Sequence, residues 1–202
     1  VNIAMVTYNR LYFTQLAVQA VLELTSHPYL LTVVDNNSQD GTREFLLELK
    51  RRQRIHNLFL LEKNLGVAKA ANIAWLSAPH CPYYLKLDND VILQKKNWLG
   101  PMVAMIDRVK DAGVAAYNFE RARFPLHGRP PFRYQLKKEG NLGGACFLVP
   151  ERTRNLLGYW CEDYGLYGEE DADYCDRVRC AGLKNIYMED NQTGIHHPTL
   201  DK

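Results

Sequence analysis

The sequence has little net charge and no long hydrophobic run. Its 202 residues include 25 lysines and arginines against 23 acids, a formal charge of +2, so composition gives no reason to expect a nucleic-acid partner. No apolar stretch reaches the roughly 20 residues that span a membrane. The chain begins at Val1, inside a strand-like run and without a signal-peptide pattern. We therefore expect a piece excised from a longer chain.

Cysteine is also scarce, and its spacing is irregular. An odd count without a CxxC pair argues against both a disulfide framework and a structural zinc site. We expect reduced thiols in a cytoplasmic protein. The five cysteines are Cys81, Cys146, Cys161, Cys175 and Cys180.

Three signature loops of nucleotide-using enzymes are missing. The first strand-like run, "VNIAMVTYN", is not followed by GxGxxG, which disfavours NAD binding. It also lacks the DxDxT of haloacid-dehalogenase-like phosphotransferases and the Gly-rich basic loop of sugar nucleotidyltransferases. An Asp pair does occur later in the chain, but Asp90 is followed by Val91 and Ile92.

Short apolar runs alternate with segments of helical periodicity through the first half of the chain. This alternation predicts an α/β fold, with a mostly parallel central sheet covered by helices on both faces. Ligands in such sheets bind beyond the carboxyl ends of the strands. The expected strands are "VNIAMVTYN", "LLTVVD", "LFLLE", "YYLKLD" and "GVAAYNF", with helices at 14–24, around Phe45 to Leu49, within 64–76 and around Trp98 to Val109.

The second half is less regular. Residues Glu120 to Asn141 contain three prolines and several arginines without periodicity, which predicts a mobile loop or a crossing segment. A strand is expected in "GGACFLVP", where the Gly pair allows close approach of a backbone or ligand. A helix follows in "GEEDADYCDRVRCAG", then a short strand "KNIYM" and the closing "GIHHP".

The stretch "YYLKLDNDVIL" places Asp88, Asn89 and Asp90 at the end of a buried strand. Carboxylates at positions i and i+2 can share one hard cation, and Mg²⁺ or Mn²⁺ prefers such oxygen ligands. The alternative is a solvated turn, because Asp and Asn favour turns. Resumption of apolar sequence at Val91 makes an exposed turn the poorer interpretation.

A second group of acids crowds the start of the last expected helix. The helix dipole favours acids in the first turn, which is the plain structural explanation. Their density is harder to explain, since like charges at i,i+3 and i,i+4 repel. We expect some of them to have a partner: a metal, a substrate hydroxyl or Arg177. The acids are Glu169, Glu170, Asp171, Asp173 and Asp176.

Two further features leave alternatives open. In the loop after the second strand, Asp35 can accept a hydrogen bond from a nucleobase, although the neighbouring Asn and Ser residues serve equally as turn formers. His196 and His197 lie on opposite faces if their segment is a strand, so at most one readily meets the Asp pair. A surface His pair is an equally good interpretation.

In their order and spacing, six motifs resemble those of the family 2 glycosyltransferases, which have the GT-A fold. The motifs are "VTYNR", "VVDNNSQDGT", "NLGVAKAAN", "LKLDNDV", "GGACFLV" and "EEDADYCDRVRCAG". The resemblance covers nearly the whole chain. It implies one catalytic domain over 1–202, in which residues 1–119 bind a nucleotide-sugar and residues 120–202 bind the acceptor.

The resemblance also implies roles for individual residues on the donor side. Thr7, Tyr8 and Asn9 would line the base and ribose, and Asp35 would accept a hydrogen bond from the base, most commonly uracil. Relatives often carry Arg where this chain has Ala71, so a phosphate contact would be missing or supplied by Lys69. The other implied donor-site residues are Asn64, Gly66, Asp88 and Asn89.

For the metal and the acceptor, the resemblance implies a second set of residues. Asp90, with Asp88 beside it, would bind a divalent cation, Mn²⁺ or Mg²⁺, and His196 would complete the metal site. Asp171 would be the catalytic base, but the extra acid in "GEEDAD" leaves that role open between Asp171 and Glu170. The Gly pair, Gly143 and Gly144, would lie under the sugar or acceptor.

The activity implied is metal-dependent, inverting transfer of a sugar, most commonly from a UDP-sugar, to a hydroxyl group during cell-surface polysaccharide or glycoconjugate synthesis. The acceptor would be a glycan, a lipid-linked molecule or a protein. A cytoplasmic location is expected, with peripheral contact to a membrane if the basic run from Lys50 to Arg54 is more than a solvated helix end. The alternative is an inactive domain that binds nucleotide-sugar or glycan without turnover.

Overall fold

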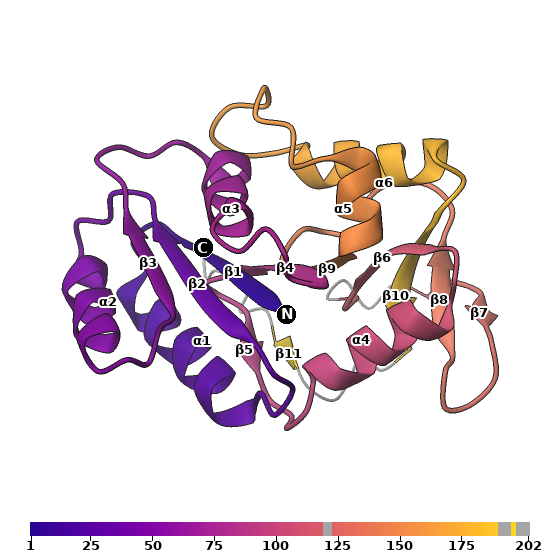
Figure 1. The fold of residues 1–202 in the computed structure, drawn as a ribbon, viewed down its shortest axis with the longest axis horizontal. Coiled ribbons are helices and arrows are strands. Elements are labelled where there is room, and N and C mark those ends of the chain that lie inside the picture. The colour runs from indigo at the N-terminus through magenta and orange to yellow at the C-terminus, as the bar shows by residue number, and fades with distance from the viewer. Residues whose placement is uncertain (119–122, 190–194, 197–202) are drawn as a thin grey trace.

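The central element of the protein is a nine-stranded sheet. The computed structural model describes residues 1–118 and 123–189, together with the backbone of residues 195–196. The sheet has the order β3-β2-β1-β4-β9-β6-β10-β8-β7 and is twisted, with helices on both faces (Figure 1). Among the described residues, no helix has both the length and the apolar character needed to cross a membrane.

The first four strands are parallel, as the alternating pattern predicts. Each of the first three is followed by a helix that carries the chain back to the edge of the sheet where the next strand begins, which is the connection that parallel strands require. The strands are β1 (Asn2–Thr7), β2 (Leu30–Asp35), β3 (Asn57–Leu60) and β4 (Tyr83–Asp88), and the helices are α1 (Leu11–Leu24), α2 (Thr42–Arg51) and α3 (Val67–Leu76).

Beyond β4 the sheet is mixed. Strand β9 (Cys146–Pro150) runs antiparallel to both β4 and β6 (Ala112–Ala116), whereas β10 (Lys184–Met188) is parallel to β6. A two-stranded pair, β5 (Ile92–Leu93) with β11 (Ile195–His196), lies apart from the main sheet. The helices of this half are α4 (Leu99–Arg108), α5 (Glu151–Leu157) and α6 (Glu170–Cys180).

Two hydrophobic cores lie on opposite faces of the sheet because alternate residues of a strand point in opposite directions. Ile3 and Met5 of β1 pack toward α1, α2 and α4, while Ala4 and Val6 pack toward α3 and α6. Figure 1 shows the first group of helices below the sheet and α3, α5 and α6 above it.

An aromatic cluster fills the upper core and joins the two halves of the sheet. The Trp75 ring of α3 lies 5.4 Å from those of Tyr84 and Trp160, and the Trp160 ring lies 4.9 Å from Tyr174 of α6. Phe147 of β9 packs against Trp160 at 5.0 Å. Offset and tilted pairs at these separations stabilise a core beyond the area that they bury.

The expectation of a loop or crossing segment between residues 120 and 141 is wrong for part of that segment. The hairpin of β7 (Leu126–His127) and β8 (Tyr134–Lys137) extends the sheet, with β8 antiparallel to β10. Tyr134 and Gln135 are buried by this pairing, which the local sequence pattern does not predict. Residues 119–122, within or beside that segment, lie outside the described part of the chain.

Candidate functional site

The loops after β1 and β2 are joined at the carboxyl edge of the sheet by Asp35. This carboxylate is fully buried and accepts hydrogen bonds from the Thr7 hydroxyl (2.9 Å), the Ser38 amide (2.9 Å) and the Ser38 hydroxyl (2.5 Å). The Arg43 guanidinium lies 3.7 Å away. The predicted hydrogen bond from a base to Asp35 stays a prediction. In the structure, Asp35 holds the two loops together.

The loop after β1 turns through two successive left-handed residues, Asn9 (φ 55°) and Arg10 (φ 62°). This conformation is costly for residues with a Cβ, so the surroundings must hold it. The Asn9 amide donates to the Ser38 hydroxyl (2.7 Å), and the Asn9 side chain accepts from the Gln39 amide (2.8 Å). Tyr8, just before the turn, is half exposed, which leaves its ring available to a ligand.

The turn brings the Arg10 side chain into contact with Asp90, the predicted metal ligand. Its guanidinium donates to Asp90 Oδ2 at 2.5 Å, and the Asp90 side chain is only 10% exposed. Asn89, between the two acids, is buried and donates to the Thr14 hydroxyl (2.8 Å) and to the Asn9 carbonyl (3.3 Å). The strand end is therefore fixed to the first loop and to α1 before any ligand binds.

On the other side of the strand end, Asp88 accepts a hydrogen bond from the buried Lys86 ammonium at 2.6 Å. The same ammonium donates to the Gly144 carbonyl at 2.8 Å. Burial by itself would lower the pKa of Lys86, but the surrounding carboxylates, Asp88 foremost, outweigh burial and raise it. The ammonium is therefore a fixed positive charge within the site.

The two candidate bases are placed differently at the start of α6. Asp171 is half-buried and accepts from the Gly144 amide (2.8 Å), from the Asn141 side chain (3.1 Å) and from the Ala172 amide (2.8 Å). Glu170 is buried, and its carboxylate accepts from the Gly168 amide at 3.1 Å. Asp171 is thus held in place by hydrogen bonds and is partly accessible to solvent, whereas Glu170 bonds the turn before the helix.

The remaining donor-side residues lie around the start of α3. The Asn64 side chain accepts from the Gly66 amide at 2.9 Å, and Gly66 has φ 89°. A Cβ on Gly66 would lie 2.3 Å from the Gly165 carbonyl oxygen, so only glycine allows this approach. Lys69 lies 3.5 Å from Glu162, and its predicted phosphate contact stays a prediction.

Of Gly143 and Gly144, only Gly144 lies at a close approach to other groups. Gly143 has φ 73°, a left-handed conformation that favours glycine. A Cβ on Gly144 would lie 3.2 Å from Lys86 Nζ and 3.3 Å from Asp171 Cβ. Gly144 therefore lets Lys86 and Asp171 lie close to the backbone, and the predicted position of the pair under the sugar or acceptor stays a prediction.

The carboxylates after β4 have the chemistry of a hard-cation site. Mg²⁺ and Mn²⁺ prefer oxygen ligands and keep positions for water and phosphate oxygens, so Asp88 and Asp90 fit as a two-carboxylate set. Among residues whose side chains are described, no three His, Cys, Asp or Glu groups gather as a metal site. The backbone of His196 pairs with Ile92, its side chain lies outside the description, and His197 lies outside the described residues altogether.

Sequence reasoning missed Arg10, Lys86 and Asn141. A signal for Lys86 was present: alternate residues of a strand share a face, so Lys86 in "LKLD" points to the same side as Asp88. A lysine inside an otherwise apolar strand needs a carboxylate partner. Arg10 and Asn141 gave no comparable signal, because their partners are distant in sequence.

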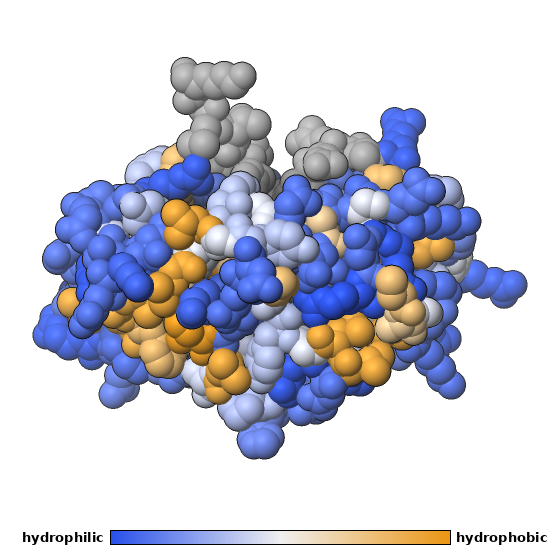
Figure 2. Space-filling model, turned by 90° about the horizontal axis from the view of Figure 1, so that it is seen from above, coloured by the Kyte–Doolittle hydropathy of each residue, from blue (hydrophilic) through white to orange (hydrophobic). Residues whose placement is uncertain are grey.

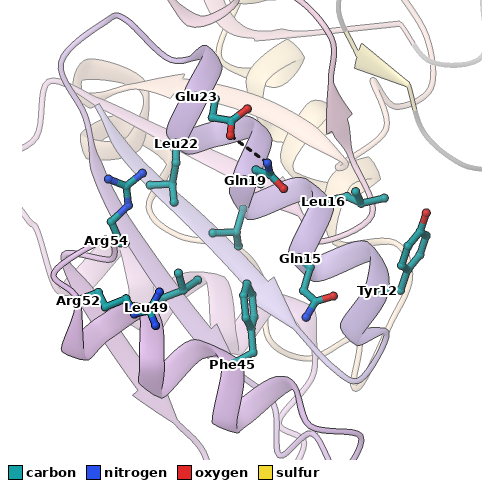
Figure 3. A pocket seen from close by; sticks show the side chains of 11 residues that line it. Tyr12, Gln15, Leu16, Gln19, Leu22, Glu23, Phe45, Leu49, Arg52 and Arg54 are labelled. Atoms are coloured by element: carbon teal, nitrogen blue, oxygen red, sulfur yellow. Dashed lines mark hydrogen bonds between the residues drawn. The ribbon is translucent and has the colours of Figure 1, made fainter.

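A wide hollow between α1 and α2 is not where these residues gather. It has a volume of about 480 Å³, and its walls include Leu16, Leu22, Phe45 and Leu49, with Arg52 and Arg54 at one end (Figure 3). None of the predicted site residues lines it. On the opposite, upper face, Figure 2 shows apolar areas separated by polar surface. We therefore place the candidate site at the carboxyl edge of the sheet.

Comparison with known proteins identifies the family of the chain. The family model described as glycosyl transferase family 2 matches residues 2–153, more than half of the chain. The chain belongs to glycosyl transferase family 2. The matched residues include β1, β2 and β4 with their loops. Among curated protein sequences, none matches this chain.

Solved structures share the fold of this family 2 member at low sequence identity. S. aureus TarS is 18% identical (TM-score 0.71), with 98% of this chain and 36% of TarS covered. GalNAc-T7, solved with UDP, GalNAc and Mn²⁺, is 17% identical (TM-score 0.72; 92% and 41% covered). The mannosyltransferase PcManGT from Pyrobaculum calidifontis, solved with GDP-Man and Mn²⁺, is 16% identical (TM-score 0.68; 94% and 54% covered). The chain thus spans about a third to a half of these proteins.

Proposed function

We propose that this chain is the catalytic part of a metal-dependent, inverting glycosyltransferase that uses a nucleoside-diphosphate sugar, with UDP-sugar as the first choice. The observation that carries the proposal is the pairing of two carboxylate centres. Asp88 ends strand β4 and Asp90 follows it, while Asp171 lies in the first turn of helix α6. Lys86 and Gly144 connect Asp88 to Asp171. Sugar transfer needs both centres, one for the leaving diphosphate and one for the acceptor.

On the acceptor side, Asp171 removes the proton from the acceptor hydroxyl as its oxygen attacks the anomeric carbon. The bond between that carbon and the diphosphate oxygen breaks on the opposite face, so the configuration inverts. The transition state resembles an oxocarbenium ion. General base catalysis of this kind contributes roughly 10²–10⁴-fold to the rate. The three hydrogen bonds that Asp171 accepts hold it in place for this step.

On the donor side, Asp90 with Asp88 would hold the divalent cation, which neutralises the charge that develops on the diphosphate. Arg10 must then leave Asp90 or share it, and its guanidinium is a good ligand for phosphate oxygens. Tyr8, which is half exposed in the loop after β1, is the proposed stacking partner of the base. The preference for UDP is supported by related structures whose names include UDP-GlcNAc and UDP, and Mn²⁺ is named with two of the relatives.

The segment before α6 is the proposed acceptor surface. Tyr164, Leu166 and Tyr167 expose 45%, 60% and 84% of their surface, directly before the base. Their backbone is held down, because the Leu166 carbonyl accepts from the Val67 amide at 3.1 Å. Exposed aromatic rings on a backbone held in this way suit the apolar face of a sugar ring, so a glycan or glycosylated molecule is the proposed acceptor class.

The test is release of nucleoside diphosphate from UDP-Glc, UDP-GlcNAc, UDP-Gal and GDP-Man, with Mn²⁺ or with EDTA and with a mixture of simple glycosides as acceptors. We expect one nucleotide class to be consumed in the presence of Mn²⁺ and spared in EDTA. Turnover that is indifferent to EDTA would contradict the metal dependence.

A second candidate, a nucleotide-sugar-binding domain without turnover, is favoured by one observation: Arg10 already neutralises Asp90. Such a domain would bind nucleotide equally well with and without Mn²⁺ and would release no diphosphate from any donor.

A further inference from the structure

The buried lysine of β4 contacts both halves of the site. Only 2% of the Lys86 side chain is exposed, and the sequence around it, "YYLKLD", is otherwise apolar up to Asp88. A lysine in such a position is costly unless its charge and its donors are matched. One partner, Asp88, is two residues away, whereas the other, the Gly144 carbonyl, is 58 residues away in sequence.

The chain of contacts continues from Gly144 to the base. While the Gly144 carbonyl accepts from Lys86, the Gly144 amide donates to Asp171 at 2.8 Å. Absence of a Cβ on Gly144 is what allows Lys86 and Asp171 to approach it at the same time. The next residue, Ala145, accepts from the Asp88 amide at 2.9 Å, so the segment is held to the strand end a second time.

We propose that Lys86 is a positioning residue that fixes the spacing between the diphosphate end of the site, at Asp88, and the acceptor base, Asp171. This inference rests on the proposed function for its catalytic meaning. Because only 2% of its side chain is exposed, Lys86 acts through the backbone of Gly144 and not on a substrate. Without Lys86, the Ala145 contact and the pairing of β9 with β4 still hold the segment to the strand. Asp88 and the Gly144 carbonyl, however, lose the donor that links them.

Hydrogen exchange of the Gly144 amide tests the positioning directly and does not require any enzymatic activity. In Lys86→Met, which keeps most of the volume and removes the donors, we expect this amide to exchange at least about tenfold faster than in the wild type. The matched control is Asn2→Ala. Asn2 is also buried, lies on the neighbouring strand β1 and bonds the Ala74 carbonyl at 2.8 Å, but at the opposite end of the strands. Unchanged protection of Gly144 in Lys86→Met would overturn the proposal.

Kinetics supply the second readout. For the donor that the wild type turns over, we expect kcat of Lys86→Met to fall at least about tenfold while the dissociation constant of the nucleotide with Mn²⁺ changes less than about threefold. A merely structural role would lower the amount of active protein and leave kcat per folded molecule unchanged. Equal kcat in the variant and in Asn2→Ala would therefore also overturn the proposal.

If Lys86→Met does not fold, Lys86→Gln takes its place, because a neutral amide can still donate to one of the two partners. We expect faster exchange at Gly144 in that variant as well, and unchanged exchange would count against the proposal. Failure of the proposed function looks different: the wild type would bind no nucleotide, while the exchange comparison at Gly144 would stand.

Discussion

Strands β1 to β4 and strands β6 to β10 form one sheet, yet they are connected in different ways. In the first half, β1, β2 and β3 are neighbours in sequence order, each joined to the next by one helix, and β4 then pairs with β1 on its other side. In the second half, β9 enters the sheet between β4 and β6, with Leu85 opposite Leu148. Local periodicity is enough to specify the first arrangement. The second depends on pairing between segments far apart in sequence.

The same contrast holds at the site. On the proposed donor side, the loops after β1 and β2 are joined by hydrogen bonds of Asp35, Ser38 and Asn9. Asp35 and Ser38 are buried. On the proposed acceptor side, Tyr164 and Tyr167 face solvent near the half-buried Asp171, the proposed base. The donor side is thus largely preformed, whereas the acceptor side is an open surface. Variants on the two sides are therefore expected to change different quantities: nucleotide binding and stability on the donor side, and sugar transfer on the acceptor side.

The largest effect is expected at the base. Asp171→Asn should lower kcat by roughly 10²–10⁴-fold, because an amide cannot take the acceptor proton. Binding of nucleotide with Mn²⁺ should stay within about threefold of the wild type, since the donor side is untouched. Steady-state kinetics and calorimetry measure the two quantities. Glu170→Gln is the matched variant, and a larger loss of kcat there than in Asp171→Asn would reassign the base.

The aromatic cluster is expected to hold the two halves of the sheet together. Trp75→Ala should lower the free energy of unfolding by about 3–5 kcal/mol, because it leaves a cavity among rings from both halves. Urea unfolding measures the change. Leu76→Ala, one residue further along α3 and more than half exposed, should cost far less, and equal losses would contradict the importance of the cluster.

Removing the buried carboxylate of the donor loops should have an intermediate effect. Asp35→Ala leaves the Ser38 amide and the Thr7 hydroxyl without their acceptor, at a cost of about 1–3 kcal/mol in the free energy of unfolding. Glu44→Ala, an exposed acid in the first turn of the neighbouring helix, is the control. A stable Asp35→Ala variant that no longer binds nucleotide would instead show that Asp35 serves the ligand alone.

At the acceptor surface, a substitution should leave stability unchanged. Tyr167→Ser removes a ring that is 84% exposed, so the free energy of unfolding should change by less than about 0.5 kcal/mol. Hydrolysis of the donor by water should be unaffected, while transfer to a glycoside acceptor falls. Loss of donor hydrolysis would place Tyr167 on the donor side and break the division between the two.

The last and smallest expected difference is in the reactivity of the cysteine thiols toward alkylation. Burial raises the pKa of Cys175 to about 12 and raises that of Cys146 as well. A thiol with a raised pKa stays protonated below that value, so neither should react with iodoacetamide at pH 8, whereas the exposed Cys180 should. Mass spectrometry of the alkylated protein identifies the sites. Alkylation of Cys175 in the folded state would show that α6 opens.

The pattern of residues predicted the parallel strands and their helices because each lies close to its neighbours along the chain. It did not predict the β7–β8 hairpin, whose burial comes from pairing with β10, or α5, which directly follows β9. For the site, the carboxylates were found from their position at a strand end. Arg10 was missed because its partner, Asp90, is distant in sequence. For Lys86, the alternation of the strand already pointed to Asp88, but its contact with Gly144 could not be read from the sequence.

One calorimetric experiment tests the central claim most directly. UDP, GDP and dTDP are titrated into the protein with and without Mn²⁺, and the best case is repeated with Asp90→Ala and Asp171→Asn. We predict Mn²⁺-dependent binding of one nucleotide, lost in Asp90→Ala and retained in Asp171→Asn. Binding of none of the three to the folded protein, or binding that survives Asp90→Ala unchanged, would contradict the assignment of the donor site to the end of β4.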